Sequence, residues 1–342
     1  MPRFRPEDGP ELAKLISWAA GEGQALEVIT GGSKRGLGRP VEAPHILDVT
    51  GFTGIEAYEP EELVLTAKPG TLLREIEAML DRAEQMLAFE PGDWGPLLGE
   101  APGRQTLGGM LACNLAGPRR IKQGAARDHL LGFHAVSGRG EAFKAGGRVV
   151  KNVTGYDLSK LMAGSYGTLA VLTEVTVKVL PKPEATGTLL LSSLDHERAV
   201  AAMTQALNSP HEVSGAAHLP NATTGGVLPA AARPTTLIRL EGPRPSVEAR
   251  AAALGQELGD FGAAELLLDA AAITPWRVLA DVGPFAAEHD RAVWRISVAP
   301  QSGPGVAAAI TRALDARFFV DWAGGLVWCA VAADVTDGGA EI

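Results

Sequence analysis

The sequence predicts an α+β protein with two domains, and three observations support this. The chain has 342 residues, which is enough for two domains of ordinary size. Of these residues 46% are hydrophobic and 21% are charged, so each domain can bury a core. The pattern of helices and strands changes at the segment Leu180–Glu184, where prolines end a strand ladder and stiffen a linker. We therefore expect domains at residues 1–184 and 185–342.

Hydrophobic periodicity predicts two helices and three strands in the first domain. Apolar residues three and four positions apart indicate a helix, and a proline at the first position favours a helix start. Short apolar runs that lead into glycine or proline indicate strands. The helices are expected at Pro10–Ala20 and from Thr71 onwards, and the strands at Ala25–Thr30, Leu63–Lys68 and Thr168–Val179.

The strand at Thr168–Val179 has the clearest alternation. Every second residue from Val171 to Val179 is valine or threonine, which predicts that these five side chains share one face. The residues between them are of mixed polarity, so the opposite face has a different environment. We expect Val171, Thr173, Val175, Val177 and Val179 on the first face and Leu172, Glu174, Thr176 and Lys178 on the second.

The second domain begins with the order strand, helix, strand, strand, helix, strand. This order is the split βαβ plan of a ferredoxin-like layer. A further strand, a helix and a hairpin around Ala323–Gly325 follow it. The expected elements lie near Thr186–Leu191, Glu197–Leu207, Val213–Leu219, Thr235–Leu240, Val247–Leu258 and Ala264–Leu268, and then at Ala292–Pro300 and Gly305–Ala316.

Charge and cysteine content exclude two functional classes. The net charge of −9 argues against nonspecific nucleic-acid binding, which needs a basic face. It does not exclude an anionic cofactor, because backbone amides can bind phosphate locally. Cys113 and Cys329 both lie in apolar runs, so we expect two free thiols. Two cysteines are too few for a Cys₄ iron–sulfur cluster.

The sequence contains no recognisable export signal or membrane span. The N-terminal ten residues, MPRFRPEDGP, lack the apolar stretch of a signal peptide. The most apolar late run, FFVDWAGGLVWCAVAADV, is interrupted by Asp321 and two glycines. We therefore expect a cytoplasmic protein.

The first of four glycine-rich segments is Val28–Gly38, VITGGSKRGLG, in which a strand runs into a loop. Loops of this kind let successive N–H groups converge on a phosphate. The segment is not a P-loop, because Lys and Ser/Thr do not follow its last glycine. It is not a Rossmann turn, because Pro40 and Pro44 follow in place of a helix. A phosphate cradle and a simple surface turn both remain open.

The second and third segments are Gly103–Gly117, GRQTLGGMLACNLAG, and Gly124–Phe133, GAARDHLLGF. Small residues in the second segment let the backbone approach a flat, bulky group closely. The alternative is a helix start packed tightly on a neighbouring element. The third segment places Arg127 and Asp128 beside an apolar run, which on its own indicates only a helix end or a strand start.

The fourth segment is Lys151–Val175, KNVTGYDLSKLMAGSYGTLAVLTEV. Asp157 is expected to cap a short helix that ends at Gly164. Gly167 then lets the chain enter the alternating strand.

Together, the four segments resemble the FAD-binding domain of the vanillyl-alcohol oxidase and p-cresol methylhydroxylase (PCMH) type. The resemblance covers roughly Gly9–Pro183, and the second, third and fourth segments carry it. Within that group these segments are similar in sequence to the FAD-binding subunits of glycolate oxidases. The segments LAFEPGDWG and VWRISVAP give weaker support for this similarity. The resemblance implies two α+β subdomains in the first domain. It also implies that a ferredoxin-like α/β cap domain follows and serves as the substrate domain.

The resemblance also implies a cofactor site for noncovalent FAD, since no histidine lies in or beside the first glycine loop. The pyrophosphate would bind the amides of Thr30, Gly31, Gly32, Ser33 and Lys34. The flavin and ribityl chain would lie along Thr106, Gly108, Gly109, Asn114 and Gly117, with Arg127 and Asp128 steadying that wall. The adenine end would be formed by Gly155, Asp157, Gly164, Gly167 and Val171.

The implied function is that of an FAD-binding subunit in a multi-subunit glycolate oxidase, or glycolate dehydrogenase. Glycolate would be oxidised to glyoxylate by hydride transfer to the flavin N5 atom. The implied partners are a second flavoprotein subunit and an iron–sulfur subunit, through which the chain could associate with the inner membrane. Three alternatives stay open: a stand-alone FAD oxidoreductase acting on another 2-hydroxy acid or alcohol, a flavin-free structural subunit, and a simple metabolite-binding module.

Three features depart from the family pattern or add to it. His211 and His218 have the spacing of a metal-binding pair, with Glu212 as a third candidate ligand, but the core of the companion subunit's metal motif is missing. We expect ordinary histidines and no metal site. Arg295 is the one candidate anchor for a substrate carboxylate. Related flavoproteins usually end with a segment that returns to the flavin domain, whereas this chain ends with VTDGGAEI, so we expect a short C-terminal tail.

Overall fold

The computed structural model describes residues 1–147, 155–228 and 233–332. It divides the chain into two units, each described by itself below. The first unit holds Met1–Ala116 and Gly124–Lys182, and the second holds Gly117–Gln123 and Pro183–Ile342. The short segment Gly117–Gln123 therefore leaves the first unit and returns to it. The C-terminal residues on which the expected short tail rests, and the start of the fourth glycine-rich segment, lie outside the described residues.

One layer of the first unit is a three-stranded parallel sheet with helix α1 (Gly9–Gly21) packed against it. Asp8 begins this helix by accepting a hydrogen bond from the Glu11 amide, and Pro10 stands in the first turn. The apolar stripe of α1, including Leu12 and Ile16, packs against Leu47 in a buried cluster. The strands, in sheet order, are β1 (Arg3–Phe4), β3 (His45–Asp48) and β2 (Leu26–Ile29).

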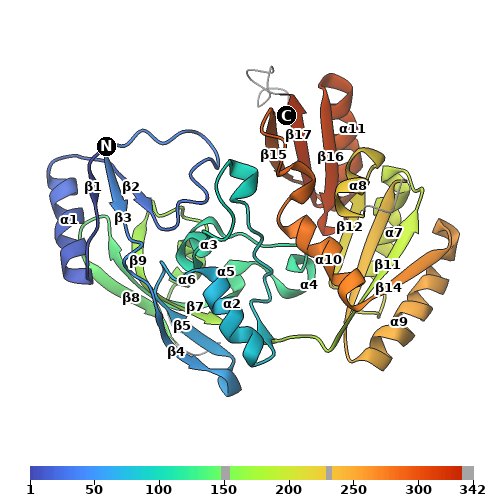
Figure 1. Ribbon diagram of the computed structural model, residues 1–342, viewed down its shortest axis with the longest axis horizontal. Helices are drawn as coiled ribbons and strands as arrows, with labels where there is room; N and C mark the ends of the chain where they lie inside the picture. The colour runs from blue at the N-terminus through green and yellow to red at the C-terminus, as the bar shows by residue number, and fades with distance from the viewer. Residues whose placement is uncertain (148–154, 229–232, 333–342) are drawn as a thin grey trace. The chain divides into compact units, whose positions relative to one another are not determined.

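The other layer of the first unit is a five-stranded antiparallel sheet (Figure 1). The predicted alternating strand is β9, and it lies between β5 and β7. In sheet order the strands are β4 (Ile55–Glu59), β5 (Val64–Ala67), β9 (Ala170–Lys178), β7 (Leu130–Ser137) and β8 (Ala142–Gly146).

The expected alternation of β9 fails near Thr173. His134 of β7 pairs with Glu174, whereas the next residue, Ala135, pairs with Leu172, so the register skips Thr173. An extra residue of this kind interrupts the period of two and changes which face the following side chains occupy. The prediction that all five residues from Val171 to Val179 share one face is therefore wrong.

Short elements complete the first unit. Thr106 caps α3 by accepting a hydrogen bond from the Gly109 amide. Asp157 caps α6 by accepting one from the Lys160 amide, as predicted. These elements are α2 (Leu73–Arg82), β6 (Gln85–Met86), α3 (Leu107–Cys113), α5 (Ala126–His129), α6 (Leu158–Met162) and β10 (Leu180–Pro181), with 3₁₀ turns at Pro60–Glu62 and Pro96–Leu98.

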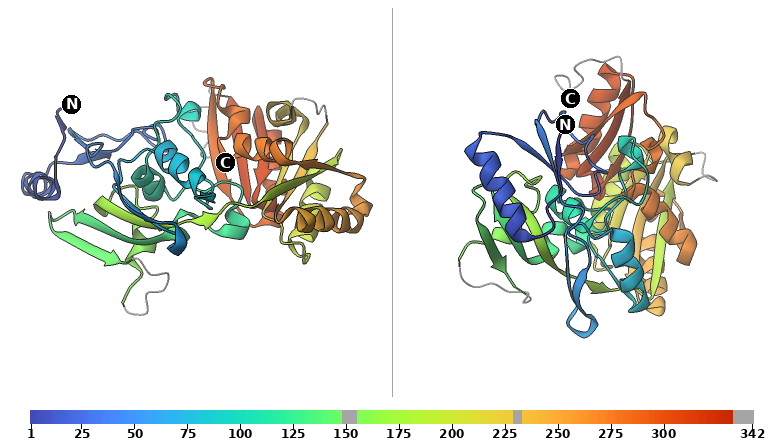
Figure 2. Two further views of the ribbon diagram at one scale, coloured as in Figure 1. Left: turned by 60° about the horizontal axis from the view of Figure 1, so that its bottom comes forward. Right: turned by 60° about the vertical axis from the view of Figure 1, so that its left-hand side comes forward.

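The second unit is built on a seven-stranded antiparallel sheet (Figures 1 and 2). The chain order begins β11, α7, β12, α8, β13, α9, β14. Its first four strands stand in the sheet order β14-β11-β13-β12, and β16, β17 and β15 extend that sheet. The strands are β11 (Ala185–Ser192), β12 (Gly215–Leu219), β13 (Thr235–Gly242), β14 (Ala264–Leu268), β15 (Arg291–Ser297), β16 (Ala316–Asp321) and β17 (Leu326–Ala332).

Three helices of the second unit share one buried core with the sheet. Ala199 of α7, Leu254 of α9 and Ile310 of α11 belong to one apolar cluster with strand residues such as Leu191 and Val327. The helices are α4 (Arg120–Gln123), α7 (His196–Leu207), α8 (Asn221–Val227), α9 (Arg244–Glu257), α10 (Asp269–Ala280) and α11 (Gly303–Ala313), with 3₁₀ turns at Gly259–Phe261, Gly283–Phe285, Pro300–Ser302 and Trp322–Gly324.

The elements predicted for the second half are observed within a few residues of their expected positions. Helices α8 and α10 are present in addition to the predicted elements. Helix α10 contains Pro275 in its interior, where proline normally signals a break, and α8 contains two consecutive glycines.

A buried charged cluster lies in the sheet of the second unit. Arg239 is 1% exposed and Glu241 is its neighbour on β13, with 3.7 Å between the Arg239 Nε and Glu241 Oε2 atoms. Arg119, from the segment Gly117–Gln123, binds the same carboxylate with both Nη2 (2.6 Å) and Nε (3.1 Å). Burial by itself would raise the pKa of Glu241, but the charges of Arg239 and Arg119 outweigh it and lower the pKa to about 2. The ion pairs thus tie that segment to the sheet.

Candidate functional site

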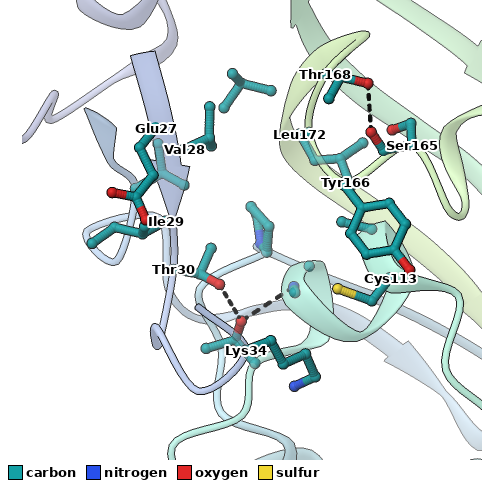
Figure 3. A pocket seen from close by; sticks show the side chains of 18 of the residues that line it. Glu27, Val28, Ile29, Thr30, Lys34, Cys113, Ser165, Tyr166, Thr168 and Leu172 are labelled. Carbon is teal, nitrogen blue, oxygen red and sulfur yellow. Dashed lines mark hydrogen bonds between the residues drawn. The ribbon is translucent and has the colours of Figure 1, made fainter. Parts of the chain in front are cut away.

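A cavity of about 330 Å³ opens in the first unit (Figure 3). Four parts of the chain supply most of its walls: β2 with the loop after it, the first turns of α3, the end of α6, and the start of β9. Residues from these parts that line the cavity include Val28, Ile29, Thr30, Gly32, Ser33, Lys34, Thr106, Gly108, Gly109, Ala112, Cys113, Tyr166, Gly167, Val171 and Leu172.

The loop after β2 supplies the polar end of the cavity. Ser33 is buried and receives a 3.2 Å hydrogen bond from the Lys34 ammonium group. Gly32 has φ +73°, a left-handed conformation that favours glycine. Gly31 does not line the cavity, because its Cα faces the backbone of Arg104, whose carbonyl oxygen a Cβ atom would overlap.

Helix α3 supplies the floor of the cavity. The Thr106 hydroxyl donates to the Thr30 hydroxyl at 2.7 Å, which joins the helix cap to the loop after β2. Gly109, Ala112 and Cys113 follow on the same stripe of the helix and line the cavity. Gly108 also lines it, but a Cβ atom there would overlap Pro69, so its small size is required by packing of chain on chain.

Positive charge exceeds negative charge among the side chains that line the cavity. The Arg35 guanidinium is held by the Glu27 carboxylate in a two-bond pair of 2.7 and 2.8 Å. Lys34 is half-buried, and burial lowers the pKa of its ammonium group. Burial also raises the pKa of the neighbouring Cys113 thiol to about 11, although Lys34 opposes this, so the thiol is neutral at pH 7. The ammonium group of Lys34 therefore gives the cavity a net positive charge beside the loop after β2.

The opposite wall comes from the turn between α6 and β9. Tyr166 donates its backbone N–H to the Ala112 carbonyl at 2.9 Å, which fixes this wall to α3. Gly167 has φ +73° and packs near Val28. The Thr168 hydroxyl donates to the Ser165 carbonyl, as Figure 3 shows, and Val171 and Leu172 add apolar surface.

Of the residues expected at the cofactor, nine line this cavity. They come from the first, second and fourth glycine-rich segments and meet although the first, Thr30, and the last, Val171, are 141 positions apart in the sequence. The nine are Thr30, Gly32, Ser33, Lys34, Thr106, Gly108, Gly109, Gly167 and Val171.

Two other expected residues support the cavity wall from behind. Asn114 ends α3 with φ 49°, and its side-chain oxygen accepts a 2.9 Å hydrogen bond from the Arg127 amide. Gly164, with φ +90°, donates its N–H to the Leu111 carbonyl, and a Cβ atom there would lie 3.4 Å from the Asn114 Cβ atom. Both residues fix the end of α3 relative to the segments around it.

The remaining expected residues lie away from the cavity lining. Arg127 and Asp128 are exposed on α5, where the Asp128 carboxylate accepts from the Ala125 amide. Gly155 and Asp157 are exposed before α6. Gly117 belongs to the second unit, and its carbonyl accepts a hydrogen bond from Trp322.

The apolar lining of the cavity is not predicted from the sequence. Val28, Ile29 and Leu172 lie on predicted strands, and Cys113 and Tyr166 lie in the glycine-rich segments. The amino-acid sequence alone does not show which face of such a strand borders a cavity. The run of small residues Gly108, Gly109 and Ala112 was the available signal for Cys113, one position further on.

The histidines and Arg295 lie in the second unit and are engaged separately. His218 is fully buried and contacts Thr236 (2.9 Å) and His196 (3.2 Å), whereas His211 contacts the Glu257 carboxylate at 2.9 Å. Burial, with His196 beside it, lowers the pKa of His218 to about 3. Arg295 is exposed on β15, with its guanidinium over the rings of Trp322 and Trp328.

Over residues 1–147, 155–228 and 233–332, no helix is both long and apolar enough to cross a membrane.

The cavity residues fit FAD. Hydroxyl groups, an ammonium group and a positive-φ glycine gather at one end, which suits a pyrophosphate. Valine, isoleucine and leucine side chains line the walls, which suits flat aromatic rings. Gly109 stands at the junction of both parts, where a Cβ atom would lie 3.1 Å from the Thr30 hydroxyl. A ligand that carries an anionic group beside flat apolar rings matches this distribution.

Comparison with known proteins agrees with this fit. Residues 3–146 match the family model described as an FAD binding domain. The glycolate oxidase subunit GlcE of Escherichia coli is 37% identical over 319 residues, which covers 93% of this chain and 79% of that protein. The glycolate oxidase subunit GlcD of Bacillus subtilis is 34% identical over 151 residues, but these cover only 44% of this chain and 30% of GlcD.

A solved structure shows the same fold. p-Cresol methylhydroxylase with substrate bound superposes with a TM-score of 0.74 at 13% identity, covering 99% of this chain and 76% of that one. The predicted α+β fold with a PCMH-type FAD-binding domain is therefore confirmed. The chain belongs to the family of FAD-linked oxidoreductases that includes the glycolate oxidase subunit GlcE.

Proposed function

We propose that this chain is an FAD-binding subunit of a multi-subunit glycolate oxidase, acting in the oxidation of glycolate to glyoxylate. The observation that carries the proposal is the extent of the match to GlcE, which spans 93% of the chain and so includes both units. A match to the FAD-binding region alone would support only a shared cofactor.

In the proposed role the cavity of the first unit holds FAD noncovalently. Thr30, Gly32, Ser33 and Lys34 bind the pyrophosphate, and Thr106, Gly108 and Gly109 border the ribityl chain and flavin. Gly167 and Val171 contact the adenine end, while Asn114 and Gly164 keep α3 in position. When bound, FAD supplies the acceptor for the two electrons that leave glycolate together with two protons. The protein residues bind and orient it and exclude water.

The electrons must then reach another centre. One cysteine of this chain lies in each unit. These two thiols cannot ligate a Cys₄ iron–sulfur cluster, because such a cluster needs four thiolates. We therefore propose an iron–sulfur subunit as acceptor and a GlcD-like flavoprotein as the second partner. Because the core of the companion subunit's metal motif is missing from this sequence, we favour a role that assists the partner flavoprotein.

Purification of the tagged chain from its native host tests this function. We expect a flavin spectrum, two co-purifying subunits of the proposed kinds, and glycolate-dependent reduction of an artificial dye by the assembly. The isolated chain should bind FAD but reduce the dye far more slowly, because its flavin would lack the companion subunits.

Other outcomes of this purification would contradict the proposal. Full dye-reducing activity of the isolated chain would show a self-sufficient oxidoreductase. A chain that joins the complex but neither carries nor takes up FAD would be a structural subunit. A chain recovered without partners would remove the basis for a multi-subunit enzyme.

A further inference from the structure

Tyr166 is the one aromatic residue among the described residues that line the cavity of the first unit. It is 58% exposed. Single exposed aromatic side chains are common on convex surfaces, but this one borders a hollow. Figure 3 shows its ring on the same side of the cavity as Leu172, with Val28 and Ile29 on the opposite side. The ring therefore borders space that a ligand can fill.

The backbone holds Tyr166 in a strained conformation. Its φ of 54° lies in the left-handed region, which is unfavourable for a bulky residue. Gly164 and Gly167 in the same turn also have positive φ values, of +90° and +73°, but they are glycines. The N–H of Tyr166 donates to the Ala112 carbonyl at 2.9 Å, which keeps the turn on α3. Strained residues of this kind gather at sites that bind ligands.

Apolar side chains surround the part of the cavity beside Tyr166. Because Gly167 has no side chain, its turn approaches β2 closely, and a Cβ atom on Gly167 would lie 3.6 Å from the Val28 Cβ atom. Val171 and Leu172 extend the same wall. Flat rings pack well against such walls, and a tyrosine ring adds a face on which another ring can stack.

FAD carries two flat ring systems, and the position of the polar end decides between them. The pyrophosphate joins the two halves of FAD, and its proposed site is the loop that holds Ser33 and Lys34. The proposed function places the flavin along Thr106 and Gly109 and the adenine end at Gly167. Tyr166 directly precedes Gly167 in the turn, so its ring belongs to the adenine side. An adenine ring can stack on an aromatic side chain whichever of its edges forms hydrogen bonds.

We propose that the Tyr166 ring stacks on the adenine ring of FAD and makes this chain select FAD over FMN. The two cofactors share the flavin, and FMN lacks the adenylate group, so a contact to adenine favours FAD alone. The inference rests on the proposed function in taking FAD as the ligand. It adds a residue that recognises one half of the cofactor, and loss of one such stack weakens binding about 5- to 100-fold.

Titration of the cofactor-free chain with FAD, FMN and ADP tests the stack. Binding of FAD and FMN is followed by flavin fluorescence, and binding of ADP by calorimetry. We expect Tyr166→Ala to weaken the binding of FAD and of ADP about 5- to 100-fold and to leave FMN affinity within about twofold of wild type. Tyr166→Phe should bind FAD within about threefold of wild type, because it keeps the ring.

Tyr156→Ala is the matched control. Tyr156 lies in the same glycine-rich segment, is 91% exposed and does not line the cavity, so its loss should leave FAD affinity within about twofold of wild type. Equal FAD affinity of wild type and Tyr166→Ala would overturn the stack, as would an equal loss of FAD and FMN affinity. Either result, with FAD bound by the wild type, leaves the proposed function standing. A chain that binds ADP through Tyr166 but takes up no FAD refutes the function and not the adenine contact.

Discussion

Replacing Ala112 with phenylalanine is expected to weaken FAD binding about 10- to 100-fold. Ala112 is half-buried on α3 and lines the cavity beside Gly109 and Cys113. A benzyl group there occupies space that the cofactor needs, and overfilling a packed site costs about 1–3 kcal/mol. Every 1.4 kcal/mol is a tenfold change in affinity. Titration of the cofactor-free protein with FAD, followed by flavin fluorescence, measures the change.

Ala142→Phe is the matched control for this substitution. Ala142 is exposed on β8, an edge strand of the five-stranded sheet, and does not line the cavity. The same increase in volume there should leave FAD affinity within about twofold of wild type. Equal affinities for the Ala112 and Ala142 variants would place the cofactor elsewhere.

Replacing Glu241 with glutamine is expected to destabilise the second unit by about 3–5 kcal/mol. Arg239 is 1% exposed, and it also lies 4.6 Å from the Trp276 ring and binds Ser214. Replacing Glu241 removes the negative charge that pairs with this buried guanidinium and with that of Arg119, and breaking a buried ion pair is costly. Urea unfolding, monitored by tryptophan fluorescence, measures the loss of free energy.

Glu248→Gln provides the control for the stability measurement. Glu248 is on α9 of the same unit and forms an exposed pair with Arg244 at 3.8 Å. Exposed pairs contribute little, so this change should alter the free energy of unfolding by less than about 0.5 kcal/mol. An equally small effect at Glu241 would mean that the buried cluster does not stabilise the fold.

The Glu241 effect should also depend on pH. The folded-state pKa of about 2 lies below the ordinary value of 4.5, so the ionised carboxylate contributes stability above pH 4.5. That contribution, of roughly 3 kcal/mol, is lost as the pH falls from 4.5 towards 2. The difference in stability between wild type and Glu241→Gln should therefore shrink across this range. A constant difference would contradict the assigned ion pairs.

Local sequence signals predicted most of the elements that form the cavity. The strand before Thr30, the cap at Asp157 and the turn at Gly167 follow from rules that act over a few residues, such as strand propensity, capping and glycine at positive φ. The nine expected residues around the cavity then depend on the family resemblance. No local rule brings Thr30 beside Thr106.

Other features depend on parts of the chain that are distant in the sequence. Gly108 lines the cavity, and the structure shows in addition that Pro69 requires this residue to be small. The bulge at Thr173 depends on the partner strand β7, which periodicity in β9 does not reveal. Gly117 ends the second glycine-rich segment, and the structure assigns it to the second unit through a segment held by Arg119 and Trp322.

Hydrogen exchange with and without FAD tests the central claim most directly, because it locates the cofactor without altering the protein. We predict that the cofactor-free chain takes up one FAD and that exchange then slows in residues 26–35, 107–113 and 165–172. Exchange in α9, which belongs to the second unit, should be unchanged. Uptake of FAD without slower exchange in those three segments, or no uptake at all, would contradict a cofactor site in this cavity.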